Sequence, residues 1–384
     1  MYRTVLTFLG LALALPAFGQ NAGFQTKAPH AVIMDYETGE VLYEKGARAA
    51  IAPASMTKIM TADMVFEALK NGTVTPDTEF QVSEEAWRRG GVKSGSSTMF
   101  LKVKSSVRVE DLLRGIIIQS GNDACIVVAE GLAGSETEFA DQMTARAKAI
   151  GLESASFRNS TGWPHPEHKI SAFDLAQLAR HSIKTYPEYY SIYGEKSFTW
   201  NKIKQGNRNP LLGKFTGADG MKTGSTEASG YGLVGSAERA GKRRIVVING
   251  LESKSDRADV SLRLMSAAFS QFKIYQLYKS GDVIGDVDVY MGAAEKVKVR
   301  IDENVQAGIF RGDRAKISSI MMSKPAVAPI TVGDHIADMI ISVPGREDKK
   351  IALFAAEDIK AKSCLLYTSP SPRDATLSRM PSSA

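Results

Sequence analysis

The alternation of apolar and polar residues predicts a hairpin followed by helices in the first half of the chain. Residues 30–47 alternate around a turn at Glu37, Thr38 and Gly39, which indicates a β-hairpin. From about Ser55 to Leu69 apolar residues cover most of a helix circumference, so this helix is predicted to be buried. Further helices are predicted in residues 109–119, 123–134 and 174–183, with a break at residues 120–122.

The pattern changes to strands in the second half. Residues 231–239 and 243–251 predict an antiparallel pair, and Asp256 to Leu277 predicts a closing helix. Beyond Ser280, short alternating runs separated by turn residues predict a small all-β domain. We therefore expect an α+β domain over residues 20–279 and a β-rich domain over residues 280–363. The second domain shows no cluster of reactive residues, which favours a spacer or docking role.

Both ends of the chain are predicted to lie outside these domains. Arg3, the apolar run Val5–Leu15 and the small residues around Gly19 are typical of a secretory signal peptide over residues 1–19, so we expect export to the periplasm. Residues 364–384 resemble the translation of a sequencing adapter. We interpret them as an artefactual tail and expect the native carboxyl terminus to be missing.

Composition excludes several classes of function. The net charge of +6 comes without a basic stripe interleaved with aromatic residues, so no nucleic-acid partner is expected. Outside the tail Cys125 is the only cysteine, which excludes a disulfide framework. The five histidines lack metal-ligand spacing, and His165 and His168 are interpreted as a solvated loop pair. We predict no metal and no cofactor.

The segment P-A-S-M-T-K places Ser55 three residues before Lys58 at a predicted helix start. A helix N-cap would explain Ser55, but a capping box has Glu or Gln three residues later. Lys58 is unfavourable there because a cation faces the positive end of the helix dipole. A catalytic pair explains both residues, since dipole and burial lower the pKa of the lysine and the spacing puts both side chains on one face. Ser55 is then a nucleophile and Lys58 its base.

Two further motifs make this hypothesis specific. S-G-N at Ser120 to Asn122 lies between two apolar helices, and K-T-G at Lys222 to Gly224 precedes a strand. Each alone is most simply a turn. In the order S-x-x-K, S-x-N, K-T-G they make a specific constellation.

The chain resembles the D-alanyl-D-alanine carboxypeptidases of the low-molecular-mass penicillin-binding proteins. PASMTKIMTA, IIIQSGNDAC and DGMKTGSTEASGYGLVGSA carry the resemblance, which covers about residues 27–363. It implies a penicillin-binding/serine β-lactamase-like transpeptidase fold, an antiparallel sheet with helices, followed by the small β domain. It also implies peptidoglycan pentapeptide as substrate, a serine acyl-enzyme and β-lactams as inhibitors. Family members usually attach to the outer face of the inner membrane through a carboxyl-terminal helix.

The resemblance also implies a role for each motif residue. Ser55 would attack the carbonyl between two D-alanines with Lys58 as general base, and Ser120 with Lys222 would relay a proton to the leaving amine. Asn122 would bond both Lys58 and the substrate amide. The remaining assignments are Lys222, Thr223, Gly224 and Arg208 for substrate binding and the backbone N–H groups of Ser55 and Ser225 for the oxyanion. Trp163 stands where we expect a leucine.

Three alternatives remain open from the sequence. A DD-endopeptidase would use the same motifs on crosslinked peptides. A class A serine β-lactamase would need a deacylating Glu, and no E-x-x-L-N-like segment occurs between Gly151 and Leu178. A catalytically silent peptidoglycan-binding scaffold would be expected to have lost Ser55 or Lys58, and both are present.

Overall fold

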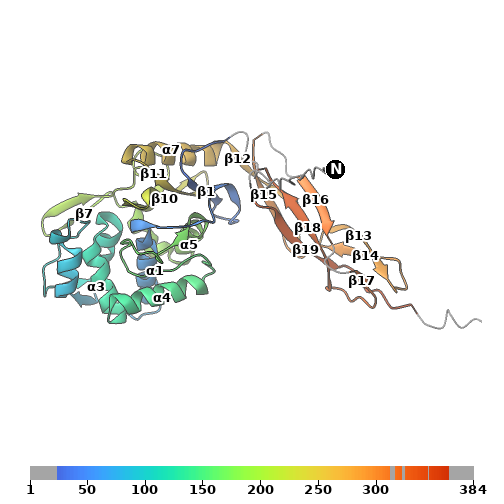
Figure 1. The fold of residues 1–384 in the computed structure, drawn as a ribbon, viewed down its shortest axis with the longest axis horizontal. Helices are drawn as coiled ribbons and strands as arrows, with labels where there is room; N and C mark the ends of the chain where they lie inside the picture. Colours follow the sequence, from blue (N-terminus) through green and yellow to red (C-terminus); the bar gives the residue numbers. More distant parts are fainter. Residues whose placement is uncertain (1–23, 312–315, 322–324, 345, 363–384) are drawn as a thin grey trace, which may run out of the picture. The chain divides into compact units, whose positions relative to one another are not determined.

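The computed structural model describes residues 24–311, 316–321, 325–344 and 346–362 (Figure 1). The chain divides into two compact units. The first extends to Ile274 and includes short segments that begin at Gly308 and Pro344, and the second starts at Tyr275. The domain ranges 20–279 and 280–363 stay predictions. The signal peptide expected over residues 1–19 and the tail expected over residues 364–384 lie outside the described residues.

A five-stranded antiparallel sheet forms the centre of the first unit. Its strands, in spatial order, are β2 (Val41–Lys45), β1 (His30–Asp35), β11 (Lys242–Leu251), β10 (Gly230–Arg239) and β9 (Ala218–Thr226). The hairpins predicted over residues 30–47 and 231–251 are confirmed as β1–β2 and β10–β11. Within this sheet β9 is an edge strand, which leaves one side of its backbone open to other groups.

Seven helices surround this sheet in the described part of the unit. They are α1 (Lys58–Lys70), α2 (Val109–Arg114), α3 (Asn122–Ala133), α4 (Glu136–Ala149), α5 (Ala172–Thr185), α6 (Pro187–Tyr190) and α7 (Lys254–Ser270). Five shorter helical segments are η1 (Ala54–Thr57), η2 (Ala86–Gly90), η3 (Val92–Ser94), η4 (Gly115–Gln119) and η5 (Ser191–Gly194). Small strand pairs are β3 (Ala50–Ile51) with β6 (Ile170–Ser171), β4 (Glu79–Gln81) with β5 (Ser106–Arg108), and β7 (Ser197–Trp200) with β8 (Ile203–Gly206). The helices predicted from the apolar pattern of the first half are confirmed.

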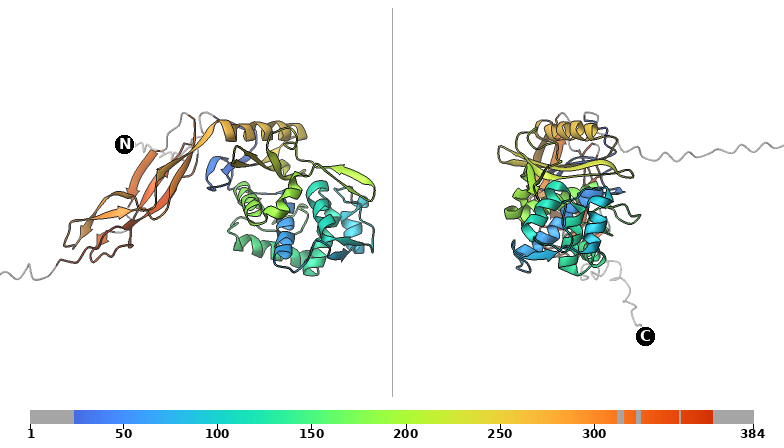
Figure 2. Two further views of the ribbon diagram at one scale, coloured as in Figure 1. Left: turned by 180° about the vertical axis from the view of Figure 1, so that it is seen from behind. Right: turned by 90° about the vertical axis from the view of Figure 1, so that its left-hand side faces the viewer.

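The sheet is buried on both faces, which explains the nearly continuous apolar runs of its strands. Successive side chains of a strand point to opposite faces. Val32 and Val247 therefore belong to one core with α1 and α5, whereas Ile33 and Val246 belong to a second core with α7. Figures 1 and 2 show α7 on one side of the sheet and α5 and α1 on the other.

The helix predicted from Asp256 to Leu277 is wrong over its last seven residues. Helix α7 ends at Ser270, and β12 (Phe272–Tyr278) follows it. The run FKIYQLY contains four aromatic or β-branched residues, which favour extended backbone, and Phe272 is buried while Lys273 is exposed. The apolar residues of this short run are compatible with a helical period, but in the structure they follow the period of a strand.

The second unit is an all-β domain, as predicted. Its six-stranded sheet has the order β16 (Lys316–Met321), β18 (His335–Ser342), β19 (Lys349–Ala355), β14 (Lys296–Arg300), β13 (Val283–Tyr290) and β17 (Ala326–Val327). A further strand, β15 (Val305–Phe310), pairs with β12. Val297, Val299, Met339 and Leu353 are among the fully buried residues of its core. The fold is therefore α+β with a small all-β domain after it.

Candidate active site

Ser55 lies in the short helix η1, directly before α1. No side chain caps the start of η1 or of α1, so the interpretation of Ser55 as an N-cap is wrong. Its hydroxyl instead accepts a hydrogen bond of 3.0 Å from Lys58 Nζ. The S-x-x-K spacing thus brings the two side chains together, as their positions on one helix face predict.

Lys58 is buried, with 1% of its surface exposed. Its amino group also donates a hydrogen bond of 2.6 Å to the backbone carbonyl of Thr161. The pKa of Lys58 is lowered to about 8, mainly by burial and also by the charge of Arg208, while Cys125, Glu136 and Asp123 oppose the shift. About a tenth of Lys58 is therefore a neutral amine at pH 7.

Ser120 and Lys222 form a second pair of hydroxyl and amine. Ser120 follows η4 in a left-handed conformation with φ of 61°, and Lys222 on β9 donates a hydrogen bond of 2.9 Å to its hydroxyl. Lys222 is 3% exposed, and burial holds its pKa well below the usual range, with the charges of Lys58 and Arg208 adding to the effect. Two buried lysines of lowered pKa thus each bond a serine hydroxyl.

Asn122, the first residue of α3, is oriented differently from its prediction. Its side-chain amide donates a hydrogen bond of 2.9 Å to Ser96 Oγ, whereas its Oδ1 is buried without a partner in the described structure. The predicted bond to Lys58 is not formed in the described structure, where the lysine amine donates to Ser55 and Thr161. The unpartnered Oδ1 remains available to a substrate N–H.

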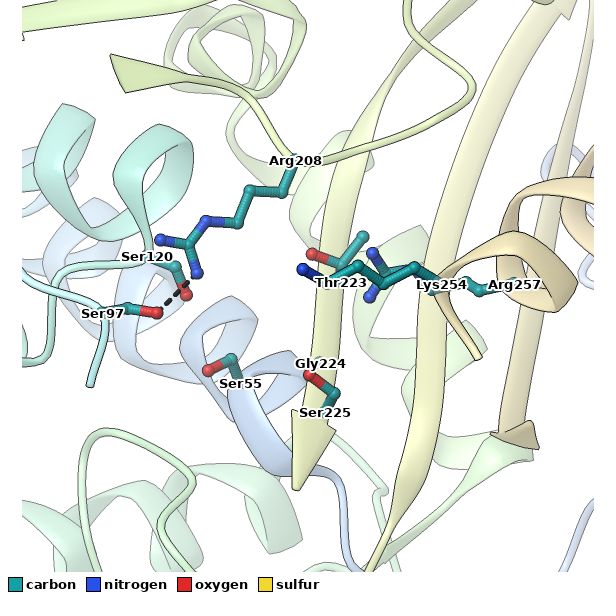
Figure 3. A pocket seen from close by; sticks show the side chains of 9 residues that line it. All are labelled: Ser55, Ser97, Ser120, Arg208, Thr223, Gly224, Ser225, Lys254 and Arg257. Carbon is teal, nitrogen blue, oxygen red and sulfur yellow. Dashed lines mark hydrogen bonds between the residues drawn. The ribbon is translucent and has the colours of Figure 1, made fainter. Parts of the chain in front are cut away.

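A cleft of about 580 Å³ brings the motif residues together (Figure 3). Its lining residues are Ser55, Ser97, Ser120, Arg208, Thr223, Gly224, Ser225, Lys254 and Arg257. In Figure 3 the side chains of Ser55 and Ser120 lie on one side of the cleft, and Thr223, Gly224 and Ser225 follow β9 on the other. Three predicted site residues do not line the cleft. Lys58 donates a hydrogen bond to Ser55 and Lys222 donates one to Ser120, both of which line it, and Asn122 donates one to Ser96, next to the lining residue Ser97.

Gly224 is required for the approach of β9 to the Ser55 turn. A Cβ atom at this position would lie 2.8 Å from the carbonyl oxygen of Pro53 and 3.1 Å from the backbone nitrogen of Ser55. Glycine therefore permits close contact between strand and turn. Ser225, the next residue on β9, lines the same cleft as Ser55.

Three cationic side chains line the cleft, and only Arg208 among them was predicted from the sequence. Arg208 donates a hydrogen bond to Ser97 Oγ, and Lys254 and Arg257 come from the first turn of α7. Burial lowers the pKa of Arg257, and its Nε atom has no hydrogen-bond partner in the described structure. The rule that identifies Lys58 would also have found Lys254 and Arg257, because both are cations in the first turn of a helix, where the dipole disfavours them.

His168 is not a solvated loop residue, so that interpretation was wrong. It is 2% exposed, its Nδ1 accepts from the backbone N–H of Arg158, and its Nε2 lies 2.8 Å from Thr57 Oγ1. Because Nδ1 is an acceptor, the ring proton is on Nε2 and is donated to Thr57. Burial, aided by charges that include Lys58, lowers the pKa of His168 to about 4. The histidine thus supports the turn that carries Ser55.

No group of His, Cys, Asp and Glu side chains suited to a metal ion occurs among the residues that the structure describes. The cleft is lined by hydroxyls, a lysine amine, guanidinium groups and the backbone of β9. These groups suit acyl transfer from a substrate that carries a carboxylate.

Comparison with known proteins gives matches over both units. A family model described as D-alanyl-D-alanine carboxypeptidase matches residues 17–253, and a model of the penicillin-binding protein 5 C-terminal domain matches residues 272–361. The chain is 35% identical over 312 residues to the D-alanyl-D-alanine carboxypeptidase DacD of Salmonella typhimurium, covering 80% of each protein.

Solved structures agree with these matches. The D-alanyl-D-alanine carboxypeptidase DacD from Francisella tularensis superposes with a TM-score of 0.74 at 30% identity, covering 91% of this chain and 98% of that one. Penicillin-binding protein D2 from Listeria monocytogenes in its ampicillin-bound form has a TM-score of 0.56 at 29% identity, covering 65% of this chain and 100% of that one.

Proposed function

The chain belongs to the D-alanyl-D-alanine carboxypeptidase family of low-molecular-mass penicillin-binding proteins and is a serine-type carboxypeptidase, and from this premise we propose that Ser55 is its nucleophile. The observation that carries the proposal is the 3.0 Å hydrogen bond from the buried amine of Lys58 to the Ser55 hydroxyl. A pKa of about 8 leaves roughly a tenth of Lys58 neutral at pH 7, enough to act as general base.

The reaction begins when Ser55 Oγ forms a bond to the carbonyl carbon between the two terminal D-alanines and its proton passes to Lys58. The backbone N–H groups of Ser55 and Ser225 stabilise the oxyanion of the tetrahedral intermediate. Losing one such donor costs about 2.7–4 kcal/mol in other enzymes. The C–N bond then breaks, the terminal D-alanine leaves, and water hydrolyses the ester on Ser55.

Ser120 and Lys222 deliver the proton that the leaving amine requires. Their 2.9 Å hydrogen bond forms a short path from a buried amine to the cleft. Lys222 thus loses one proton to the leaving amine while Lys58 holds the proton taken from Ser55; in deacylation Lys58 returns its proton to Ser55 and the attacking water supplies one to Lys222. Asn122 orients the substrate by accepting from its amide N–H through the unpartnered Oδ1.

The terminal carboxylate of the substrate binds at the cationic end of the cleft. Thr223 and Arg208 contribute there, and Lys254 and Arg257 add two further positive charges. A cationic site of this kind suits the free carboxylate that lies next to the scissile bond at a pentapeptide terminus.

β-Lactams should acylate the same serine. The Listeria monocytogenes relative is described in an ampicillin-bound form. In this chain, a β-lactam would meet the same nucleophile, oxyanion donors and cations that we propose for the peptide substrate. Opening of the lactam ring by Ser55 leaves a penicilloyl ester on the enzyme.

We place this activity in the periplasm, because the substrate is peptidoglycan and the relatives are bacterial carboxypeptidases. The described part of the chain contains no helix with the length and apolar character needed to span a bilayer. We propose that the natural protein is held at the outer face of the inner membrane by a carboxyl-terminal helix, as is usual in this family. Membrane fractionation of the chain to Ser363, with and without such a helix, tests this, and stable membrane retention of the helix-free form contradicts it.

A fluorescent penicillin tests the central proposal. Labelling followed by peptide mass spectrometry is expected to find the adduct on Ser55, and Ser55→Ala is expected to abolish both labelling and release of D-alanine from a pentapeptide. Ser106→Ala, which changes an exposed serine of β5, serves as the matched control. Labelling of Ser55→Ala at the rate of the control would refute the assignment.

A further inference from the structure

The loop of residues 159–163 holds the amine of Lys58 in place. The backbone carbonyl of Thr161 accepts the 2.6 Å hydrogen bond from Lys58, and the carbonyl of Ser160 accepts one of 2.6 Å from Thr61 Oγ1 on α1. Asn159 Oδ1 accepts from the backbone nitrogens of Gly162 and Trp163 at 2.7 and 3.1 Å, which fixes the internal shape of the loop. The position of Thr161 therefore decides whether the Lys58 amine faces Ser55.

Glu136 ties this loop to helix α4. Its Oε1 accepts from the backbone nitrogen of Ser160 at 3.1 Å and from the Ser160 hydroxyl at 2.7 Å. Its Oε2 lies 3.2 Å from a guanidinium nitrogen of Arg89, and only 12% of the Glu136 side chain is exposed. Both carboxylate oxygens are thus engaged, one with the loop and one with a cation.

Arg89 contacts the loop a second time, at its other end. Its guanidinium carbon lies 5.2 Å from the ring centre of Trp163, within the range of a cation–π interaction. Arg89 thus stabilises the loop at Ser160 through Glu136 and at Trp163 directly. Trp163, which replaces the leucine expected here, supplies the aromatic face that this contact needs.

We propose that Glu136, held by Arg89, is a positioning residue for acylation: it fixes the 159–163 loop so that the Thr161 carbonyl keeps the Lys58 amine on Ser55. Glu136 touches no reacting atom and acts through Ser160 and Thr161. The inference rests on the proposed role of Lys58 as general base.

The charge of Glu136 provides an independent readout. Glu136 raises the pKa of Lys58, as do Cys125 and Asp123 from α3, whereas burial and the charge of Arg208 lower it. Lys222 on β9 is the other buried amine coupled to Lys58. Removing the Glu136 charge should therefore move the acidic limb of the acylation profile to lower pH, while loss of positioning should reduce the plateau rate.

The experiment measures the second-order rate constant of acylation by a fluorescent penicillin from about pH 6 to about pH 10. Glu136→Ala is expected to lower the plateau about 10- to 100-fold, because small misplacements of catalytic groups have effects of this size. Glu136→Gln keeps an acceptor for Ser160, so it should retain most of the plateau and still show the shifted limb. Glu138→Ala, an exposed residue in the same turn of α4, should show neither change.

A second pair of variants separates positioning from folding. Arg89→Gln removes the contacts to Glu136 and Trp163, whereas Arg88→Gln removes only an ion pair of an exposed arginine with Glu85. Arg89→Gln should lower the plateau at least several-fold more than Arg88→Gln. If Glu136→Ala does not fold, Glu136→Gln and the arginine pair decide the question. Equal plateaus and limbs for the Glu136 and Glu138 variants, or for the two arginine variants, would overturn the proposal.

Lys58→Arg, measured in the same series, separates a failure of the base role of Lys58 from a failure of the positioning role of Glu136. If Lys58→Arg retains acylation, the role of Lys58 as base fails. If Lys58→Arg is inactive and the Glu136 variants match their control, the base assignment stands and the positioning role alone fails.

Discussion

Lys222 donates a 2.9 Å hydrogen bond to Ser120, which joins the edge strand β9 to the turn between η4 and α3. The two residues are 102 positions apart in the chain, so the bond depends on the packing of the sheet against the helices. Because Lys222 is buried and its pKa is lowered, the pair can pass a proton into the cleft.

Ser120→Ala is expected to remove this path while leaving Ser55 and Lys58 intact. General acid–base steps contribute about 100- to 10,000-fold, so D-alanine release should fall by an amount in this range. Ser105→Ala, which removes a hydroxyl that bonds the nearby Lys102 carbonyl, is the control. Turnover of Ser120→Ala within tenfold of that control would exclude a role in proton transfer.

Lys58 should contribute to activity at the expense of stability. Its folded-state pKa of about 8 lies below the ordinary value of 10.5, so the unfolded chain binds more protons between these pH values and stability rises with pH across them. Below about pH 8 the buried lysine therefore destabilises the fold, by about 3 kcal/mol. Lys58→Met should abolish acylation and raise the urea midpoint at pH 7 by more than at pH 10. If the substitution raises the urea midpoint less at pH 7 than at pH 10, the sign of this prediction is wrong.

The motif residues could be predicted because they depart from what the local secondary structure favours. Lys58 stands in a helix turn that disfavours cations, and the S-G-N segment interrupts two apolar helices. The sheet and most helices were predictable for a related reason, since their apolar periods are long and regular. The error at residues 271–277 arose where the period is only a few residues long.

The missed residues act through contacts that no local pattern encodes. Thr161 contributes a backbone carbonyl, which every residue has, and its partner is 103 positions away. His168 resembles any loop histidine until the fold buries it against Thr57. Ser96 and Ser97 lie in a glycine–serine stretch that is typical of a solvated turn, yet they bond Asn122 and Arg208. Long-range packing therefore decides these roles.

His168 should make the enzyme sensitive to acid. Its folded-state pKa of about 4 lies below the ordinary 6.5, so the unfolded chain binds more protons between these values and stability is lost as pH falls from 6.5 to 4. The full loss corresponds to about 3 kcal/mol. In His168→Gln, the fall in unfolding free energy between pH 7 and pH 4.5 should be smaller by about 1–3 kcal/mol. His165→Gln replaces an exposed neighbour whose charge helps to lower the pKa of His168, so it should reduce the fall by less than His168→Gln does, and an equal effect of both variants would argue against this role.

Gly162, the one glycine of the 159–163 loop, should not tolerate replacement. Its φ is +86°, and a Cβ atom would lie 1.9 Å from the carbonyl oxygen of Ala54, the residue before Ser55, and 2.9 Å from Thr57 Oγ1. Gly162→Ala must therefore displace either the loop or the nucleophile turn. We expect at least a 100-fold loss of acylation, because a displacement of about 1 Å has effects of that order.

Gly151→Ala separates this clash from backbone strain alone. Gly151 has a similar φ of +83°, but nothing lies within 4 Å of its added Cβ atom. Its replacement should cost about 1–2 kcal/mol of stability from the left-handed conformation and leave acylation unchanged. Rates of fluorescent penicillin labelling and urea midpoints measured for both variants provide the comparison. If Gly162→Ala acylates as fast as Gly151→Ala, then the loop and the Ser55 turn can separate without loss of function, and the contact between them has no role in holding the nucleophile.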